Sequence, residues 1–70
     1  MLAIKDFKAP KGKFRVIGVD TFDQEGSDWI EGDFKTQEDA FAKARSAGGE
    51  MTKTHVYNDK GIHVYEAGTF

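Results

Sequence analysis

The chain has 70 residues, a formal net charge of −2 and no cysteine. This length supports one compact domain and excludes a two-domain enzyme, and the lack of cysteine excludes disulfides, thiolate zinc sites and cysteine nucleophiles. The apolar stretches are far shorter than the about 20 residues that span a membrane, and the first residues lack the apolar core of a signal peptide. We therefore expect a cytoplasmic protein that forms a single domain over residues 1–70.

The apolar residues are few for a chain that must fold alone. They make up 39% of the sequence, and several of them are alanines, which bury little area. A domain of this size without a disulfide or a metal gains only about 3–5 kcal/mol from its core. The aromatic residues must supply much of this energy, or a second copy of the chain must, so we consider a homodimer.

Charge is distributed unevenly along the chain. Residues 1–15 carry five basic side chains and one acid, whereas residues 16–40 carry eight acids and one lysine. We interpret residues 1–13 as a basic arm and linker, in which residues 2–7 either pack on the domain or stay loose. The simplest role of these charges is to offset the acidic segment, and the alternative is phosphate binding in a nucleic-acid complex. The candidate phosphate contacts are Lys5, Lys8, Lys11, Lys13 and Arg15.

A β-hairpin is predicted after the linker. Residues 14–22 are rich in β-branched and aromatic side chains, which favour a strand. The adjacent Val16 and Ile17 interrupt the alternation of apolar and polar residues that a strand usually shows, and a bulge at Gly18 would restore this alternation. Residues 23–27 have turn composition, and residues 28–34 return as the second, antiparallel strand.

A helix is predicted next. Thr36 is a good N-cap, and Asp39 follows at the third position of a capping box. Residues 38–47 contain good helix formers, and Gly48 or Gly49 is expected to end the helix in the left-handed conformation. The predicted buried stripe consists of Ala40, Phe41, Ala44 and Ala47.

Two further strands are predicted over residues 51–57 and 62–70. The Asn-Asp-Lys-Gly sequence between them is typical of a type I turn with a glycine bulge. The element order is therefore β-β-α-β-β. We predict an α+β fold in which one antiparallel four-stranded sheet carries a single helix packed on one face.

The turn at residues 58–61 also sets the expected register of the last two strands. With Asn58 opposite Ile62 and no break in the pairing, Tyr57 is expected to face His63, Val56 to face Val64 and His55 to face Tyr65. Histidines and tyrosines then share the face of the sheet away from the helix, although a slip of one residue would reverse their faces. The candidate binding-face residues are Lys53, His55, Tyr57, His63 and Tyr65. The face under the helix is expected to hold Val56, Ile62, Val64 and Phe70.

This predicted Tyr/His face has several possible roles. Tyrosine and histidine suit a surface that a second copy of the chain or another protein covers. Rings presented by a sheet also stack on nucleobases, and cross-strand aromatic pairs can simply stabilise a hairpin. Two histidines supply only two metal ligands, so we predict no metal and no cofactor.

The remaining motifs do not predict an active site. Residues 20–28 have the acidic composition of a calcium-binding loop, but aligning Gly26 with its required glycine puts Thr21 at the first aspartate and Gly32 at the closing glutamate. We interpret this segment as an acidic hairpin tip. The sequence has no phosphate-binding glycine pattern and no nucleophile motif. We assign no catalytic residue and expect a protein that is not an enzyme.

One partial resemblance covers residues 14–45. The sequence Gly-Asp-Phe-Lys-Thr-Gln-Glu-Asp-Ala-Phe-Ala, which begins at Gly32, resembles the strand-to-helix junction of arm-type DNA-binding domains of phage integrases. Those domains carry basic residues on the DNA-facing strands, whereas Asp28, Glu31 and Asp33 occupy the second strand here. The whole chain is more similar to small β-β-α-β-β proteins of bacteria and phages, whose functions are uncharacterised.

From the sequence we therefore predict a small binding or adaptor module. It is expected to self-associate or to dock a protein partner through the Tyr/His face. The alternative is a nucleic-acid-binding module that uses the basic arm for phosphate and the same face for stacking.

Overall fold

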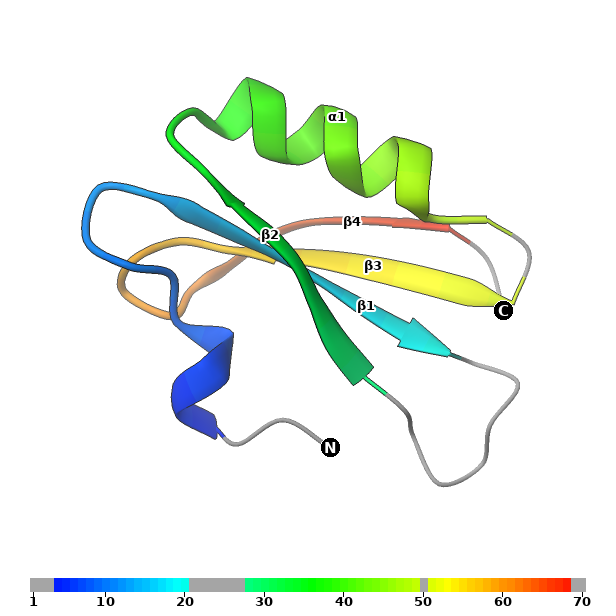
Figure 1. The fold of residues 1–70 in the computed structure, drawn as a ribbon, viewed down its shortest axis with the longest axis horizontal. Helices are drawn as coiled ribbons and strands as arrows, with labels where there is room; N and C mark the ends of the chain where they lie inside the picture. Colours follow the sequence, from blue (N-terminus) through cyan, green and yellow to red (C-terminus); the bar gives the residue numbers. More distant parts are fainter. Residues whose placement is uncertain (1–3, 21–27, 50, 69–70) are drawn as a thin grey trace.

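The computed structural model describes residues 4–20, 28–49 and 51–68. These residues form one antiparallel sheet with strand order β2-β1-β3-β4. One α-helix covers one face, and a short 3₁₀ helix lies on the other side (Figure 1). The elements in chain order are η1 (Ile4–Phe7), β1 (Phe14–Asp20), β2 (Asp28–Phe34), α1 (Gln37–Ala47), β3 (Thr52–Tyr57) and β4 (His63–Gly68).

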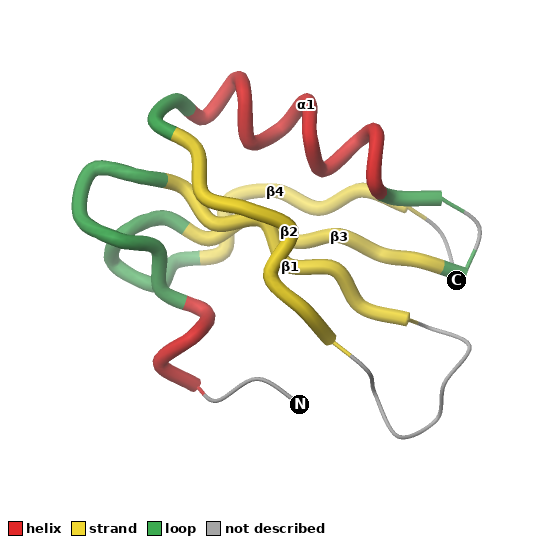
Figure 2. Tube along the Cα trace, in the orientation of Figure 1, coloured by secondary structure: helices red, strands yellow, loops and turns green. Residues whose placement is uncertain are grey.

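The predicted α+β fold is confirmed. β1 pairs with both β2 and β3, and β3 pairs with β4, in every case antiparallel. The helix connects β2 at one edge to β3 near the centre, so the two hairpins lie side by side and share one core (Figure 2). None of the described helices is long and apolar enough to cross a membrane.

The main core lies between α1 and the sheet. Val16, Val56, Ala40 and Ala44 are fully buried there. The two alanines on the inner helix face leave space for the sheet to approach closely, which agrees with the predicted stripe. Thr54 is also fully buried, and its hydroxyl donates a hydrogen bond to the carbonyl of Ala44 at 2.7 Å. This bond satisfies the only buried polar side chain among the described residues.

The start of α1 is capped as predicted. The side chain of Thr36 accepts a hydrogen bond from the backbone N–H of Asp39 at 3.2 Å. The acidic side chains of the first turn, Glu38 and Asp39, also lie at the positive end of the helix dipole.

We expect Thr36→Ala to destabilise the protein by about 1 kcal/mol, because the N–H of Asp39 loses its partner. Chemical denaturation measures this loss. Thr36→Ser keeps the hydroxyl and serves as the control, so an equal loss in both variants would contradict the capping role.

The end of α1 differs from the prediction. Gly48 follows the helix with φ −72° and ψ 145°, an extended conformation, and Gly49 is not among the described residues with positive φ. The left-handed position is instead Met51, with φ 63°. Gly48 is needed for a different reason: a Cβ at this position would lie 3.0 Å from the backbone nitrogen of Gly68, so the chain passes close to β4 here.

The bulge in the first hairpin lies in β2 and not at Gly18, so that prediction is wrong. Val16 pairs with Gly32 and Ile17 pairs with Ile30, which leaves Glu31 as the extra residue. The adjacent apolar residues of β1 need no bulge, because Val16 and Ile17 are both fully buried, one on each face of the sheet.

Gly18 has a packing role instead. A Cβ at this position would lie 2.6 Å from the indole ring of Trp29, its partner in β2. The indole therefore lies across the β1 backbone, and glycine provides the space. The indole N–H donates to Glu31 at 2.7 Å.

The N-terminal segment packs on the sheet face opposite α1. The ring of Phe7 meets that of Tyr57 edge to face, with ring centroids 5.4 Å apart. Ala9 is buried, and its N–H donates to the carbonyl of Asn58 at 3.1 Å. The N–H of Gly12 donates to a carboxylate oxygen of Asp59. Residues 4–12, predicted as arm and linker, are thus tied to the turn between β3 and β4.

The register of the second hairpin agrees with the prediction only near the turn. The N–H of Asn58 donates to the carbonyl of Ile62, and Tyr57 pairs with His63 as predicted. The register then shifts by one residue, so Val56 pairs with Tyr65. Val64 is the extra residue of this bulge, and the predicted pairing of Tyr65 with His55 is wrong.

Stacking on the helix accounts for this shift. The ring of Tyr65 lies on that of Phe41, with centroids 4.3 Å apart and planes 17° from parallel. The smaller Val64 could not cover Phe41 to the same extent, because an aromatic ring buries more area. Ile62 and Val64, predicted to lie in the core, are exposed instead. Phe70 and the turn at residues 23–27 lie outside the described residues.

Candidate functional site

Two histidines mark the most distinctive polar cluster on the face opposite α1. His55 lies in β3, and His63 lies at the start of β4, diagonally across the strand pair. His55 Nδ1 and His63 Nε2 are 3.0 Å apart, within hydrogen-bonding distance. We call the two residues the His pair. Burial lowers the pKa of His55 from its ordinary value, and the neighbouring His63 lowers it further. Both effects favour neutral imidazole.

An ion pair lies beside the His pair. Glu66 pairs with His55 across the strands. Its carboxylate lies 2.7 Å from the ammonium of Lys53, and this hydrogen bond lowers the pKa of Glu66. The His pair therefore has a compensated pair of charges next to it.

Tyr57 is at the site but is only partly accessible. Phe7 contacts its ring edge to face, and the ring centroid of His63 lies 5.3 Å away. Burial raises the pKa of the Tyr57 hydroxyl. Tyr57 therefore links the N-terminal segment to the His pair and offers less surface to a partner than predicted.

The predicted Tyr/His face is therefore only partly assembled. The structure brings together Lys53, His55, Tyr57 and His63, but it places Tyr65 under the helix, so Tyr65 is removed from the candidate surface. Glu66 joins the site instead. Glu66 was not predicted, because unbroken pairing of the last two strands would place it on the face under the helix.

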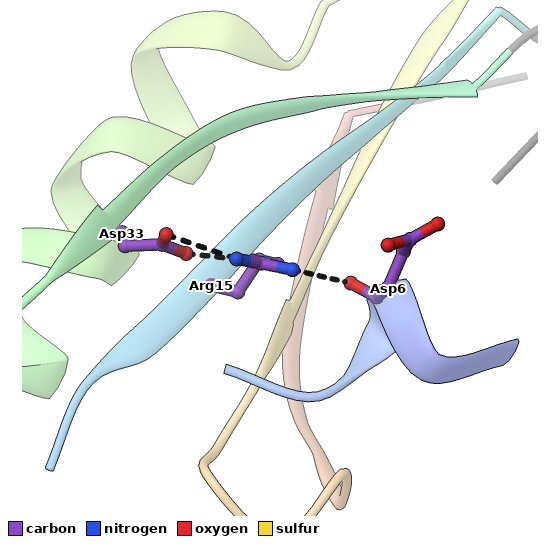
Figure 3. Close-up of polar contacts among 3 residues, drawn as sticks. All are labelled: Asp6, Arg15 and Asp33. Atoms are coloured by element: carbon purple, nitrogen blue, oxygen red, sulfur yellow. Dashed lines mark hydrogen bonds and ion pairs between the residues drawn. The ribbon is translucent and has the colours of Figure 1, made fainter. Parts of the chain in front are cut away.

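Arg15, a candidate phosphate contact, is occupied by protein groups. Its Nε and Nη2 donate to the two carboxylate oxygens of Asp33 at 2.7 and 3.1 Å. Its Nη1 donates to the backbone carbonyl of Asp6 in η1 at 3.1 Å (Figure 3). The bond to Asp33 raises the pKa of the guanidinium. Arg15 thus joins β1, β2 and the N-terminal segment.

The other candidate phosphate contacts lie near the surface. Lys5, Lys8 and Lys11 are exposed, whereas Lys13 is half-buried. Docking of the N-terminal segment brings Lys8 beside Gly61 in the turn between β3 and β4. Phosphate binding by these lysines stays a prediction.

Exposed apolar side chains lie at both edges of the sheet. Trp29 and Ile30 are 36% and 40% exposed in β2, at one edge. Val64 is 37% exposed in β4, at the other edge, and the neighbouring Ile62 is 55% exposed. The sequence did not single out this surface, because the bulge at Val64 has no clear signal in the residue pattern.

The described residues contain no group of three or more histidine, cysteine, aspartate or glutamate side chains placed to hold a metal ion. Within the same part of the chain, no pocket is found. At the His pair itself, the facing groups are two imidazole nitrogens, and the His63 side chain is exposed.

Comparison with known proteins identifies no family for this chain. No protein-family model matches it, and no curated protein or solved structure matches it either.

Proposed function

We propose that the protein is a small binding module that self-associates by pairing the β4 edge of its sheet with the β4 edge of a second copy. The observation that carries the proposal is the contrast between the two edges. β2 carries three acidic side chains, whereas Glu66 is the only acidic or basic residue of β4 other than histidine.

An edge strand is a template for pairing with another chain, and charged side chains are a common protection against it. β2 has this protection because three of its seven residues are acidic, although Asp33 is paired with Arg15 and Glu31 lies 3.8 Å from Lys43. β4 has less of it: Glu66 is its one acidic residue and is paired with Lys53, and Val64 and Ile62 add apolar area. Both edge strands contain a bulge, so the bulges do not distinguish the two edges. The number of charged side chains along each strand does.

A second copy is the occupant that this edge favours. Antiparallel pairing of one strand with its own copy satisfies two-fold symmetry, so one surface serves both partners. A near-neutral edge creates no repulsion in such a pair. The small core of the chain supports the same proposal, because pairing extends the sheet and covers apolar side chains that are exposed in one copy.

Sedimentation over a range of protein concentrations tests this proposal. We expect a monomer–dimer equilibrium, and we expect Val64→Lys to weaken dimerisation by about tenfold or more, or about 1.4 kcal/mol, because each dimer would bury two added charges at the paired edge. Circular dichroism checks that the variant folds.

Ile30→Lys is the matched control. Ile30 has nearly the same exposure as Val64 but lies at the opposite edge, so its variant should dimerise like the wild type. A wild type that stays monomeric at all concentrations, or equal effects of the two substitutions, would contradict the proposal.

A further inference from the structure

We propose that the His pair is a two-histidine chelating site for a divalent transition-metal ion such as Zn²⁺ or Cu²⁺. The ion would be bound by His55 Nδ1 and His63 Nε2, and water would complete its coordination. This inference does not depend on self-association through β4.

The spacing of the two nitrogens carries the inference. Imidazole nitrogens bind zinc at about 2.0–2.1 Å. Two such ligands on one ion are then about 2.9 Å apart at a right angle and about 3.4 Å apart at a tetrahedral angle. The observed distance between His55 Nδ1 and His63 Nε2 is 3.0 Å, so the paired strands already hold the nitrogens at a chelating distance.

Metal binding also requires a particular tautomer of each histidine. Metal binding requires neutral imidazole. When both rings are neutral, one of the two facing nitrogens carries the proton and donates a hydrogen bond to the other. On metal binding this proton moves to the second nitrogen of the same ring, so both facing nitrogens offer a lone pair and no net proton is released.

The surroundings do not oppose a cation. Lys53 is the basic side chain nearest to the pair in the register, and its ammonium is held 2.7 Å from the Glu66 carboxylate. The positive charge is therefore compensated. His63 is exposed and His55 is half-buried, so an ion and its bound water can reach the nitrogens.

Titration of the untagged protein with ZnCl₂, and separately with CuCl₂, tests the inference by calorimetry at neutral pH. The sequence contains two histidines and no cysteine, so binding through imidazole reports on this site alone. We expect one ion per chain. For Zn²⁺, the ring signals of both histidines in the NMR spectrum should shift together.

Two substitutions remove one ligand each with little change of shape. The amide of His55→Asn occupies the place of Nδ1, and the amide of His63→Gln occupies that of Nε2, so both can keep a hydrogen bond across the strands. Each should weaken metal binding about tenfold or more. Tyr57→Phe removes only the neighbouring hydroxyl and should leave the affinity unchanged.

The inference would be overturned if no binding were detected up to about 1 mM metal, which corresponds to a binding free energy of roughly −4 kcal/mol. Unchanged affinity in both histidine variants would also overturn it. So would one ion that bridges two chains and doubles the mass. The Val64→Lys variant separates this inference from self-association, because it should bind metal even when it no longer dimerises.

Discussion

We expect Ile17→Ala to lower the free energy of unfolding by about 2–5 kcal/mol, because it removes a fully buried side chain and leaves a cavity. Ile17 is the largest fully buried side chain among the described residues. It pairs with His55, so it lies on the face of the sheet opposite α1, the face on which Phe7 of η1 contacts Tyr57. A domain of this size has about 3–5 kcal/mol available from its core, so the variant should be largely unfolded at room temperature.

Urea denaturation followed by circular dichroism measures this effect. Ile17→Val should cost only about 0.5–1.5 kcal/mol, because it removes a single methyl group. Ile30→Ala is the positional control, since Ile30 pairs with Ile17 but is 40% exposed. A similar loss at both positions would show that the second face does not contribute a core of its own.

The second large effect is expected at the Arg15–Asp33 pair. Arg15→Met keeps most of the apolar stem but leaves the Asp33 carboxylate without its two guanidinium bonds. Removing one partner of a fully buried pair costs about 3–5 kcal/mol. The side chains of Arg15 and Asp33 remain 16% and 24% exposed, so water screens part of the loss and we expect about 2 kcal/mol.

A double-mutant cycle with Arg15→Met and Asp33→Asn isolates the interaction, and its coupling energy should be about 1–2 kcal/mol. Arg15→Lys should not restore stability, because an ammonium cannot make the two parallel bonds. Lys53→Met is the control at a pair whose carboxylate, that of Glu66, is 49% exposed, and it should change stability less than Arg15→Met does. Additive effects of the Arg15 and Asp33 substitutions would contradict the proposed coupling.

The elements of the fold could be predicted from local patterns. Thr36 and Asp39 identify the start of the helix, since a capping box is a short-range signal. The Asn-Asp-Lys-Gly turn predicts the second hairpin and its first pairs correctly, because Asn58 and Gly61 satisfy the turn with their own groups. The Asn58 side chain accepts from the N–H groups of Lys60 and Ile62, and Gly61 has a positive φ of 78°.

The candidate site could be predicted only in part. His55, Tyr57 and His63 lie where the turn chemistry placed them, close to the turn. Tyr65 lies beyond the bulge, and its face depends on Phe41, a residue of the helix. The alternation of apolar and polar residues within one strand does not encode its contact with an element far away in the sequence. The register shift could therefore not be predicted.

The chain places its few apolar residues on both faces of the sheet. Its apolar residues appeared too few for one core, yet they are divided between two faces of the sheet: Val16 is buried under α1 and Ile17 is buried on the face opposite α1. The N-terminal segment, predicted as arm and linker, closes part of the second face with Phe7. The guanidinium of Arg15 forms an ion pair with the carboxylate of Asp33 within the fold.

The sequence by itself determined the four strands, the helix α1, their order and the first pairs of the β3–β4 hairpin, because propensity, capping and turn geometry act over a few residues. Only the tertiary structure decided which side chains share a surface. Packing of Tyr65 on Phe41 shifted the register of β4, exposed Val64 and moved Glu66 beside the His pair. A strand alternates its side chains strictly, so one added residue moves every later side chain to the other face.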